Sequence, residues 1–547
     1  MKFIIKKVHK NWYINTFILI LVVAFLLRVY KIGVVPHGMT WDEAAIGYNG
    51  YAVVSTFRDE WLTRLPLSFR SFGDYKAPFA VYLTGLFTTP FGLSLPVVRI
   101  PFVLFGVAAI AGIMLLTKTL FSSSKHAKTL SLASGFFLTL SPWHYHYSRA
   151  GFESGLALTL VIWALYVWFW AWEQSRHQVL LLTGSATFFV LSLYTYHSTK
   201  ITVPLLLLFL AIQSKNRLLK LGKKVFIPVS VAILLSVPLL YDLLFQNGLE
   251  RAGVTIFAQG LSLQETMLLF LGQVRAHISL SFLIEGATTT LRHGDSRHGV
   301  MYVSTFILGL YGILQTVWRR LTKVEDSYAS ILWFSLFLFS IGILPAAVAL
   351  EVPHSNRALT AVIGVILLAV FGVFKLLEWC EHSPEFSSLK DSRNRKTIYF
   401  QLVMGTVFLV QSLFAVEYFS DYYTQFAAES SEAFKDGYVE AFEYVLLYEK
   451  GSGGKPEVNK ILFTSRYGQP YIYALFVRKT SPYAFHGGSL IKYEFKDSFV
   501  EGDLLRENSI LVTTPEDTMP FNKATKVIYG SDLQPRFYIF DTNTIKW

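Results

Sequence analysis

Long apolar runs, separated by short polar segments, dominate the first three quarters of the chain. Eleven of these runs are candidates for membrane-spanning helices: 14–34, 99–120, 129–148, 152–173, 179–197, 200–214, 225–245, 299–317, 328–350, 357–379 and 397–416. A helix of about 20 apolar residues crosses the hydrocarbon core of a bilayer, and the run 200–214 is short by this measure. The pattern predicts a polytopic α-helical membrane protein with about 11–13 transmembrane helices, in which residues 1–416 form the membrane domain.

Basic residues gather in five polar segments, which are 2–10, 125–128, 215–224, 318–323 and 390–396. With the spans above, all five lie on one side of the membrane, and the positive-inside rule makes this the cytoplasmic side. The N-terminus is then cytoplasmic, and the odd number of spans places the C-terminus outside. The apolar run 78–92 is expected to be interfacial or re-entrant, because only one net crossing fits between residues 79 and 120.

Composition agrees with this class of protein. Hydrophobic residues make up 53% of the chain, and its mean hydropathy is +0.42. The net charge of +12 follows from the basic segments that set the topology, so we expect no nucleic-acid partner. A single cysteine, Cys380, excludes an internal disulfide framework. The basic start of the chain, followed by an apolar run, is typical of a retained first span rather than a cleaved signal peptide.

The last part of the chain, residues 430–547, changes character. Short runs rich in β-formers at 459–465, 509–514 and 526–530 are separated by turn signals, and an amphipathic segment at 470–479 lies between the first two. Strands alternating with a helix predict a small extracytoplasmic α/β domain. It shows no phosphate-binding loop, metal-ligand spacing or nucleophile motif.

Two adjacent acids, Asp42 and Glu43, follow Trp41 in the first outer loop, residues 35–78. One interpretation is helix capping, because acids are favoured in the first turn of a helix. The other is catalysis, because a partly desolvated carboxylate at the membrane surface suits a general base. Asp74 and Lys76, later in the same loop, are candidate contacts to an anionic substrate, although an interfacial lysine often only reaches lipid headgroups.

Further charges lie at other outer ends of the spans. Arg149 and Glu153 stand at a sharp hairpin, where an ion pair at a helix start is the simpler interpretation. The nearby His144 and His146 fit an aromatic interface belt better than a metal site, so no metal-binding residues are predicted.

Two basic clusters stand on the outer side, against the trend set by the positive-inside rule. Arg297 and His298 end the long outer loop 246–298, together with Arg292 and His293, and a second pair, His354 and Arg357, precedes a later span. Lipid headgroup contact is one explanation for them. Binding the phosphate of a lipid-linked substrate is the other.

Taken in order, these residues resemble a known family. A first span is followed by WDEA (41–44), GDYKAPFAVYL (73–83), VVRIPFVLFGVAAIAG (97–112) and LSPWHYHYSRAGFESG (140–155). This order resembles the GT-C membrane glycosyltransferases, and among them the protein mannosyltransferase and aminoarabinose transferase type. The resemblance implies an inverting transfer of sugar from a polyprenyl phosphate to a hydroxyl acceptor on a protein, lipid or cell-envelope glycan, at the outer face of a plasma membrane.

The resemblance also implies roles for residues. Asp42 matches the family's base, and Glu43 is the second acid of the same motif. Lys76 matches the polar position before a Pro-Pro-Leu-like stretch, in which Ala77 here replaces one proline. The remaining candidates for contacts to the substrate or its lipid phosphate are Asp74, Arg149, Glu153, Arg297, His298, His354 and Arg357. A divalent cation would help to shield the phosphate, but the sequence shows no dedicated set of metal ligands.

Other classes of function stay open at this point. The main alternative is a multi-span transporter or flippase of a lipid-linked or anionic substrate, which would favour charges within the spans and inverted repeats. A glycan polymerase or ligase would place essential residues in a large outer loop such as 246–298. A scaffold role through residues 430–547 would leave the acidic pair without a purpose.

Overall fold

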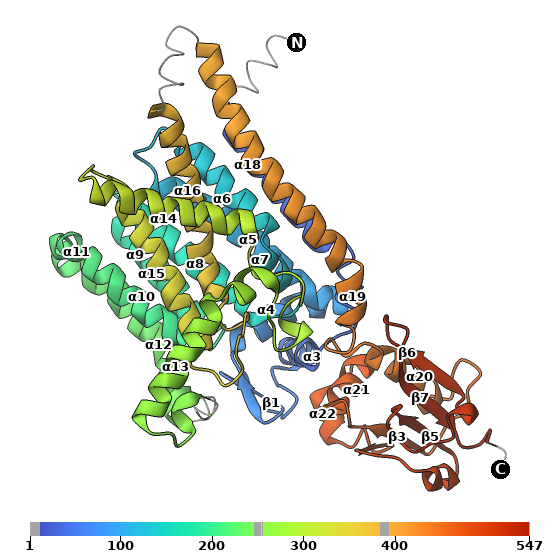
Figure 1. Cartoon of the computed structure of the whole chain (residues 1–547). Coiled ribbons are helices and arrows are strands. Elements are labelled where there is room, and N and C mark those ends of the chain that lie inside the picture. Colours follow the sequence, from blue (N-terminus) through green and yellow to red (C-terminus); the bar gives the residue numbers. More distant parts are fainter. Residues whose placement is uncertain (1–10, 246–252, 254, 383–392, 546–547) are drawn as a thin grey trace. The chain divides into compact units, whose positions relative to one another are not determined.

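The computed structural model describes residues 11–245, 253, 255–382 and 393–545. The basic tail 2–10, part of the loop 246–298 and the first residues of the basic segment 390–396 lie outside these ranges. The chain divides into two compact units. The helical unit comprises Met1–Tyr30 and Phe102–Ser420, and the mixed unit comprises Lys31–Pro101 and Asp421–Trp547. Figure 1 shows the elements of both.

The helical unit is built almost entirely from apolar helices. Its α-helices are α2 (Trp12–Val29), most of α5 (Leu95–Leu120), α6 (Ala127–Leu140), α7 (Pro142–Tyr147), α8 (Glu153–Ala171), α9 (Gln178–Leu193), α10 (Thr199–Gln213), α11 (Lys215–Leu221), α12 (Phe226–Phe245), α13 (Leu263–Ile278), α14 (Val303–Leu321), α15 (Ala329–Ala347), α16 (Val362–His382) and most of α18 (Arg393–Tyr422). Short turns of other helix types lie between them, namely η1 (Gly222–Val225), η3 (Ile256–Ala258), η4 (Ser281–Glu285), η5 (Leu291–His293) and η6 (Leu359–Ala361).

Each of the eleven predicted runs overlaps a helix, so the polytopic helical membrane protein is confirmed. By length and composition, seven helical stretches among the described residues are long and apolar enough to cross a membrane, and α6, α9 and α10 are shorter apolar helices. The run 129–148 was expected as one span, but α6 ends at Leu140 and α7 starts at Pro142. Proline has no N–H for an internal helical bond and disfavours helical backbone at the preceding residue, so it starts a new helix instead.

One helix stands at the centre of the helical unit. The stretch Leu359–Glu381 is 94% buried within the protein, whereas Trp12–Val29 is only 11% buried. Helices α14 and α15 both pack against α16. The apolar side chains that α2 leaves uncovered are those expected of a helix that faces lipid.

The mixed unit combines the first loop with the C-terminal part of the chain. Its N-terminal half contains α3 (Trp41–Thr56), the antiparallel hairpin of β1 (Phe69–Ser71) and β2 (Asp74–Lys76), and α4 (Pro78–Phe91). The predicted interfacial or re-entrant run 78–92 is α4, which has 14 residues and packs on α3. Its placement in the membrane stays a prediction.

The C-terminal half of the mixed unit holds a five-stranded sheet in the order β4-β3-β5-β7-β6. Its elements are α19 (Gln425–Glu429), α20 (Tyr438–Glu449), β3 (Lys460–Thr464), α21 (Pro470–Arg478), α22 (Pro482–His486), β4 (Tyr493–Lys496), η7 (Glu501–Leu505), β5 (Ser509–Thr513), η8 (Phe521–Lys523), β6 (Lys526–Tyr529) and β7 (Pro535–Asp541). Strands β4, β3 and β5 are parallel, and β7 runs antiparallel to β5 and β6. The three predicted strands are therefore confirmed as β3, β5 and β6, and the amphipathic segment as α21.

One hydrophobic core joins the two halves of the mixed unit. Ala44, Ala45 and Tyr48 of α3 belong to the same buried cluster as side chains of α20, α21 and the sheet. Phe442 of α20 stacks on Phe463 of β3 at 4.0 Å between ring centroids. The first loop and the C-terminal sheet therefore fold as one body.

Candidate functional site

The two acids of the first loop lie in the first turn of α3. Thr40 caps the helix, and its side-chain oxygen accepts a hydrogen bond from the Glu43 N–H at 3.2 Å. The Glu43 carboxylate in turn accepts from the Thr40 N–H at 3.1 Å. This reciprocal capping box satisfies N–H groups that a helix start leaves without partners. The capping interpretation of the sequence therefore applies to Glu43.

Glu43 is also held by an arginine. Arg99 forms a two-pronged ion pair with it, with nitrogen–oxygen distances of 2.7 and 3.2 Å. The two side chains are 0% and 1% exposed. The guanidinium also donates to the carbonyls of Ile32, Pro36 and Gly38. Glu43 is thus committed to structure and is not reachable by a substrate.

Asp42 is the accessible member of the pair. Its carboxylate forms an ion pair with Lys76, and the side chains of Asp42 and Lys76 are 17% and 8% exposed, respectively. The β1–β2 hairpin positions Lys76, which lies opposite Phe69 in the register. The structure thus brings together three predicted site residues, Asp42, Glu43 and Lys76. Asp74 starts β2, but its side chain lies outside the described part of the structure.

A third acid near α3 was not singled out from the sequence. Glu60 follows α3, is 0% exposed, and neither of its carboxylate oxygens has a hydrogen-bond partner among the described residues. Burial, reinforced by the charge of Asp59, raises the pKa of Glu60 to about 8, against opposing contributions from Asn49 and Arg70. The sequence holds no periodicity or spacing that marks this burial.

The second cluster belongs to the helical unit. The rings of His293 and His354 lie 4.4 Å apart between centroids and are tilted by 35°, and the His354 backbone N–H donates to His277 Nε2 at 3.0 Å. Tyr147 of α7 donates to the His293 carbonyl at 3.0 Å. A neighbouring pocket is lined by Pro142, Trp143, His146, Tyr147, Phe282, Gly286, Ala287, Thr288, His293, Gly294, Asp295, His298, Gly299, Val300, Ser355 and Tyr418.

Acidic and basic groups share this cluster. His298 Nδ1 lies 2.6 Å from a carboxylate oxygen of Asp295, and Arg297 lies 3.8 Å from the same side chain. Arg357 has no carboxylate within ion-pair distance among the described residues. The guanidinium of Arg357 is therefore a candidate to meet an external anion.

The neighbouring His293 and His354 are neutral rather than cationic. Burial, with the charge of the neighbouring Arg357 adding to the effect, lowers the pKa of His354 to about 3. Burial also lowers the pKa of His293 well below its usual value, with His354 and Arg292 adding to the effect. At neutral pH these imidazoles act as hydrogen-bonding groups, and the permanent positive charge comes from the arginines.

Arg149 and Glu153 of the outer hairpin do not line this pocket in the described structure. Arg149 is fully buried, and its guanidinium donates to the carbonyls of Leu27, Arg28 and Tyr30 at the C-terminal end of α2. Helix ends leave such carbonyls without partners, so we assign Arg149 a structural role. Glu153 begins α8. His146 Nε2 lies 3.0 Å from the carbonyl of Arg292.

Comparisons with known proteins agree with this architecture. Residues 75–241 match the family model of dolichyl-phosphate-mannose-protein mannosyltransferases. The apo structure of ArnT from Cupriavidus metallidurans superimposes with a TM-score of 0.54 at 10% identity, covering 98% of both chains. The chain therefore has the fold of ArnT, and residues 75–241 resemble the mannosyltransferase family. ArnT bound to undecaprenyl phosphate matches this chain with a TM-score of 0.51 at 11% identity, over 97% of this chain and 98% of that chain.

A second solved protein shares the fold of this chain. AglB, the oligosaccharyltransferase from Archaeoglobus fulgidus, in complex with an inhibitory peptide and a dolichol-phosphate, matches with a TM-score of 0.51 at 14% identity, over 93% of this chain and 70% of that chain. The chain spans 64% of the length of the apo oligosaccharyltransferase from the same organism. No curated protein matches it.

Proposed function

We propose that this protein is a glycosyltransferase that moves a sugar from a polyprenyl-phosphate donor to a hydroxyl acceptor at the outer face of a membrane, with inversion at the sugar. The observation that carries the proposal is the difference in exposure between Asp42 and Glu43. Glu43 is buried against Arg99, whereas Asp42 is partly exposed at the same helix start. Asp42 is therefore the carboxylate that can meet a substrate.

In the proposed reaction, Asp42 accepts the proton of the acceptor hydroxyl. The acceptor oxygen attacks the anomeric carbon while the bond from that carbon to the phosphate oxygen breaks. The electron pair of that bond leaves with the polyprenyl phosphate, so no nucleotide is needed. Lys76 fixes the orientation of Asp42 through their ion pair, and Glu43 fixes the helix start. General-base catalysis of this kind contributes about 10²–10⁴-fold in rate.

The leaving phosphate needs positive charge and hydrogen-bond donors. We propose that Arg297 and Arg357 supply charge, and that His298 and the neutral His354 supply hydrogen-bonding groups. A guanidinium offers forked bonds to phosphate oxygens and stays charged at any physiological pH. The ArnT structure that contains undecaprenyl phosphate supports a lipid-phosphate ligand for this fold. Asp74 and Glu153 stay predicted substrate contacts.

The test compares the two acids directly. Purified wild-type protein, Asp42→Asn and Glu43→Gln are given a panel of polyprenyl-phosphate sugars with cell-envelope extract as acceptor, and free polyprenyl phosphate is measured. We expect release from one donor by the wild type and a loss of about 10²-fold or more in Asp42→Asn at unchanged expression. Full turnover by Asp42→Asn would exclude this residue as the base. No release from any donor by folded wild type would favour the transporter or flippase alternative.

A further inference from the structure

The segment 38–43, which carries Asp42, is held on two sides within the mixed unit. On one side Arg99 binds Glu43 and the Gly38 carbonyl. On the other side, residues of the C-terminal part of the chain contact Gly38, Met39 and Trp41 of the same segment. These contacts are a backbone contact at Gly38, a hydrogen bond to Met39 and the packing of Trp41, and the last two can each be changed by a single substitution.

The first contact lies at Gly38. This glycine has a φ of +82°, and a Cβ placed on it would lie 2.5 Å from the Asp436 nitrogen and 2.6 Å from the Phe434 carbonyl oxygen. No side chain fits at such distances, and the positive φ itself favours glycine. The backbone before α20 therefore lies directly on the backbone that precedes α3.

The next two contacts bracket Asp42 more closely. The Tyr473 hydroxyl of α21 donates to the Met39 carbonyl at 2.7 Å, and both residues are 0% exposed. The Trp41 ring lies against Gly468, where a Cβ would come within 3.0 Å of it, and Lys435 Nζ stands 5.0 Å from the ring centroid. Trp41 is the residue immediately before Asp42.

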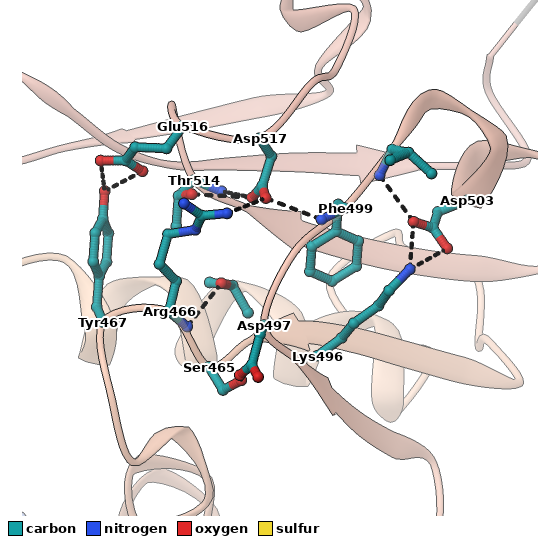
Figure 2. A network of polar contacts seen from close by, with 12 residues as sticks. Ser465, Arg466, Tyr467, Lys496, Asp497, Phe499, Asp503, Thr514, Glu516 and Asp517 are labelled. Atoms are coloured by element: carbon teal, nitrogen blue, oxygen red, sulfur yellow. Dashed lines mark hydrogen bonds and ion pairs between the residues drawn. The ribbon is translucent and has the colours of Figure 1, made fainter.

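The loop that carries Gly468 is itself fixed. Tyr438 of α20 donates to the Gly468 carbonyl at 2.8 Å. Asp517, which is 5% exposed, accepts from the N–H groups of Phe499 and Thr514 at 2.9 and 2.8 Å, and from Arg466 at 3.4 Å. Figure 2 shows how the bonds of Asp517 tie together the loops that follow β3, β4 and β5. A carboxylate shared by three loops resists their separation.

We propose that the C-terminal sheet domain positions Asp42 for catalysis, through the hydroxyl of Tyr473 on Met39 and the packing of Gly468 on Trp41. This inference rests on the proposed role of Asp42. It makes Tyr473 and Trp41 positioning residues rather than catalytic ones, since neither needs to touch a substrate. Misplacing a reacting group by about 1 Å can cost on the order of 100-fold in rate, so contacts of this kind can limit turnover.

The first test uses two matched tyrosines. Tyr473→Phe removes the bond to Met39, whereas Tyr493→Phe removes a bond of the same length, 2.7 Å, from another buried tyrosine to Glu449 within the domain. We expect Tyr473→Phe to lower kcat about tenfold with an unchanged KM for the donor. The acid limb of its kcat–pH profile should also move, because that limb reports the ionisation of the base. Tyr493→Phe should leave kcat within about twofold of the wild type and the acid limb of the kcat–pH profile in place.

The second test measures coupling between Gly468 and Trp41. The variants Gly468→Ala, Trp41→Phe and the double substitution form a cycle. The smaller ring relieves the contact with the added methyl group, whereas the backbone strain of alanine at the Gly468 φ of +88° is present in both alanine variants and cancels in the cycle. We expect the double variant to have a kcat at least about threefold higher than the two single effects predict together. The melting temperature of each purified variant is measured as well, because a variant that is slow for lack of folded protein also has a lowered melting temperature.

The outcomes separate the two proposals. Full activity of Asp42→Asn would overturn the proposed function and this inference with it. An inactive Asp42→Asn, together with equal effects of the two tyrosine variants and additive effects in the cycle, would overturn the positioning role alone.

Discussion

At the scale of single residues, the local environment separates side chains that look alike in the sequence. Asp42 and Glu43 are adjacent, but Glu43 is buried and bonded to Arg99 and Thr40, whereas Asp42 is partly exposed and paired with Lys76. His354 and Arg357 both suggested positive charge, yet burial leaves His354 neutral. The chemistry assigned to a residue type therefore depends on what surrounds it.

Glu60 gives a prediction about pH. Its pKa is raised from the ordinary 4.5 to about 8 by burial, so the folded state keeps a proton that the unfolded state releases. The stabilisation is fully present below a pH of about 4.5 and is lost as the pH rises through about 8. Glu60→Gln, a neutral mimic, should match the wild type in melting temperature at pH 5 and exceed it at pH 9. The exposed Glu457→Gln serves as the control, and parallel pH curves for wild type and Glu60→Gln would contradict the prediction.

Arg357 gives a prediction about donor binding. Removing a charged partner of a phosphate costs about 1.5–3 kcal/mol, which is about 10–100-fold in affinity. Arg357→Ala should therefore raise the donor KM by about tenfold or more and leave the fold intact. Burial lowers the pKa values of His293 and His354, so these two imidazoles should add no pH dependence to the donor affinity of the wild type near neutral pH. Titration of donor against initial rate, at several pH values, checks both statements.

At the scale of elements, the first turn of α3 depends on partners far away in the sequence. Its capping box is local, but Arg99 comes from the start of α5, and the Lys76 ammonium comes from the β1–β2 hairpin. Helix α7 is set locally instead, because the Ser141 cap and Pro142 in its first turn mark the break after α6. Local chemistry sets where a helix begins, and distant partners set what its first turn can do.

Glu43→Ala is the prediction at this scale. It leaves the fully buried Arg99 without its carboxylate, and breaking a buried ion pair in this way costs about 3–5 kcal/mol. We expect poor recovery of folded protein and a lowered melting temperature, with activity lost as a consequence. The double variant Glu43→Ala with Arg99→Met removes both charges and should recover part of the stability. A melting temperature equal to wild type in Glu43→Ala would show that Arg99 finds other partners.

At the scale of the whole molecule, the division of the chain does not follow its order. Residues 31–101 fold with residues 421–547, because α3 completes the hydrophobic core of the sheet domain. The shared core includes Ala44 and Tyr48 on one side and Phe463 and Phe476 on the other. Helix α3 therefore does not fold separately, because side chains from the C-terminal part of the chain cover its apolar face.

Deleting residues 430–547 is the prediction for the whole molecule. The deletion exposes the buried face of α3, so we expect aggregation or degradation of the truncated protein rather than a folded enzyme with altered specificity. Size-exclusion chromatography in detergent checks this outcome. A monodisperse truncated protein with a normal melting profile would show that α3 is stable without the sheet. Point variants such as Tyr473→Phe are therefore the better probes of the domain.

The sequence by itself determined the class of the protein and much of its layout. The apolar runs predicted the helical membrane protein, the short β-rich runs predicted three of the five strands, and the ordered motifs pointed to the GT-C fold. Hydrophobic periodicity and turn chemistry are local properties, so they are readable along the chain. The candidate acids were also found in this way, because a polar pair at the end of an apolar run stands out locally.

Only the tertiary structure decided which acid is accessible, that Glu60 is buried, and that Arg149 caps α2. It also revealed the contacts of Tyr473 and Gly468 with the segment that carries Asp42. Each of these facts depends on pairs of residues distant in the sequence, and burial and pairing are properties of three-dimensional neighbours. Periodicity carries no record of such pairs, and this is the physical reason that the chain alone did not reveal them.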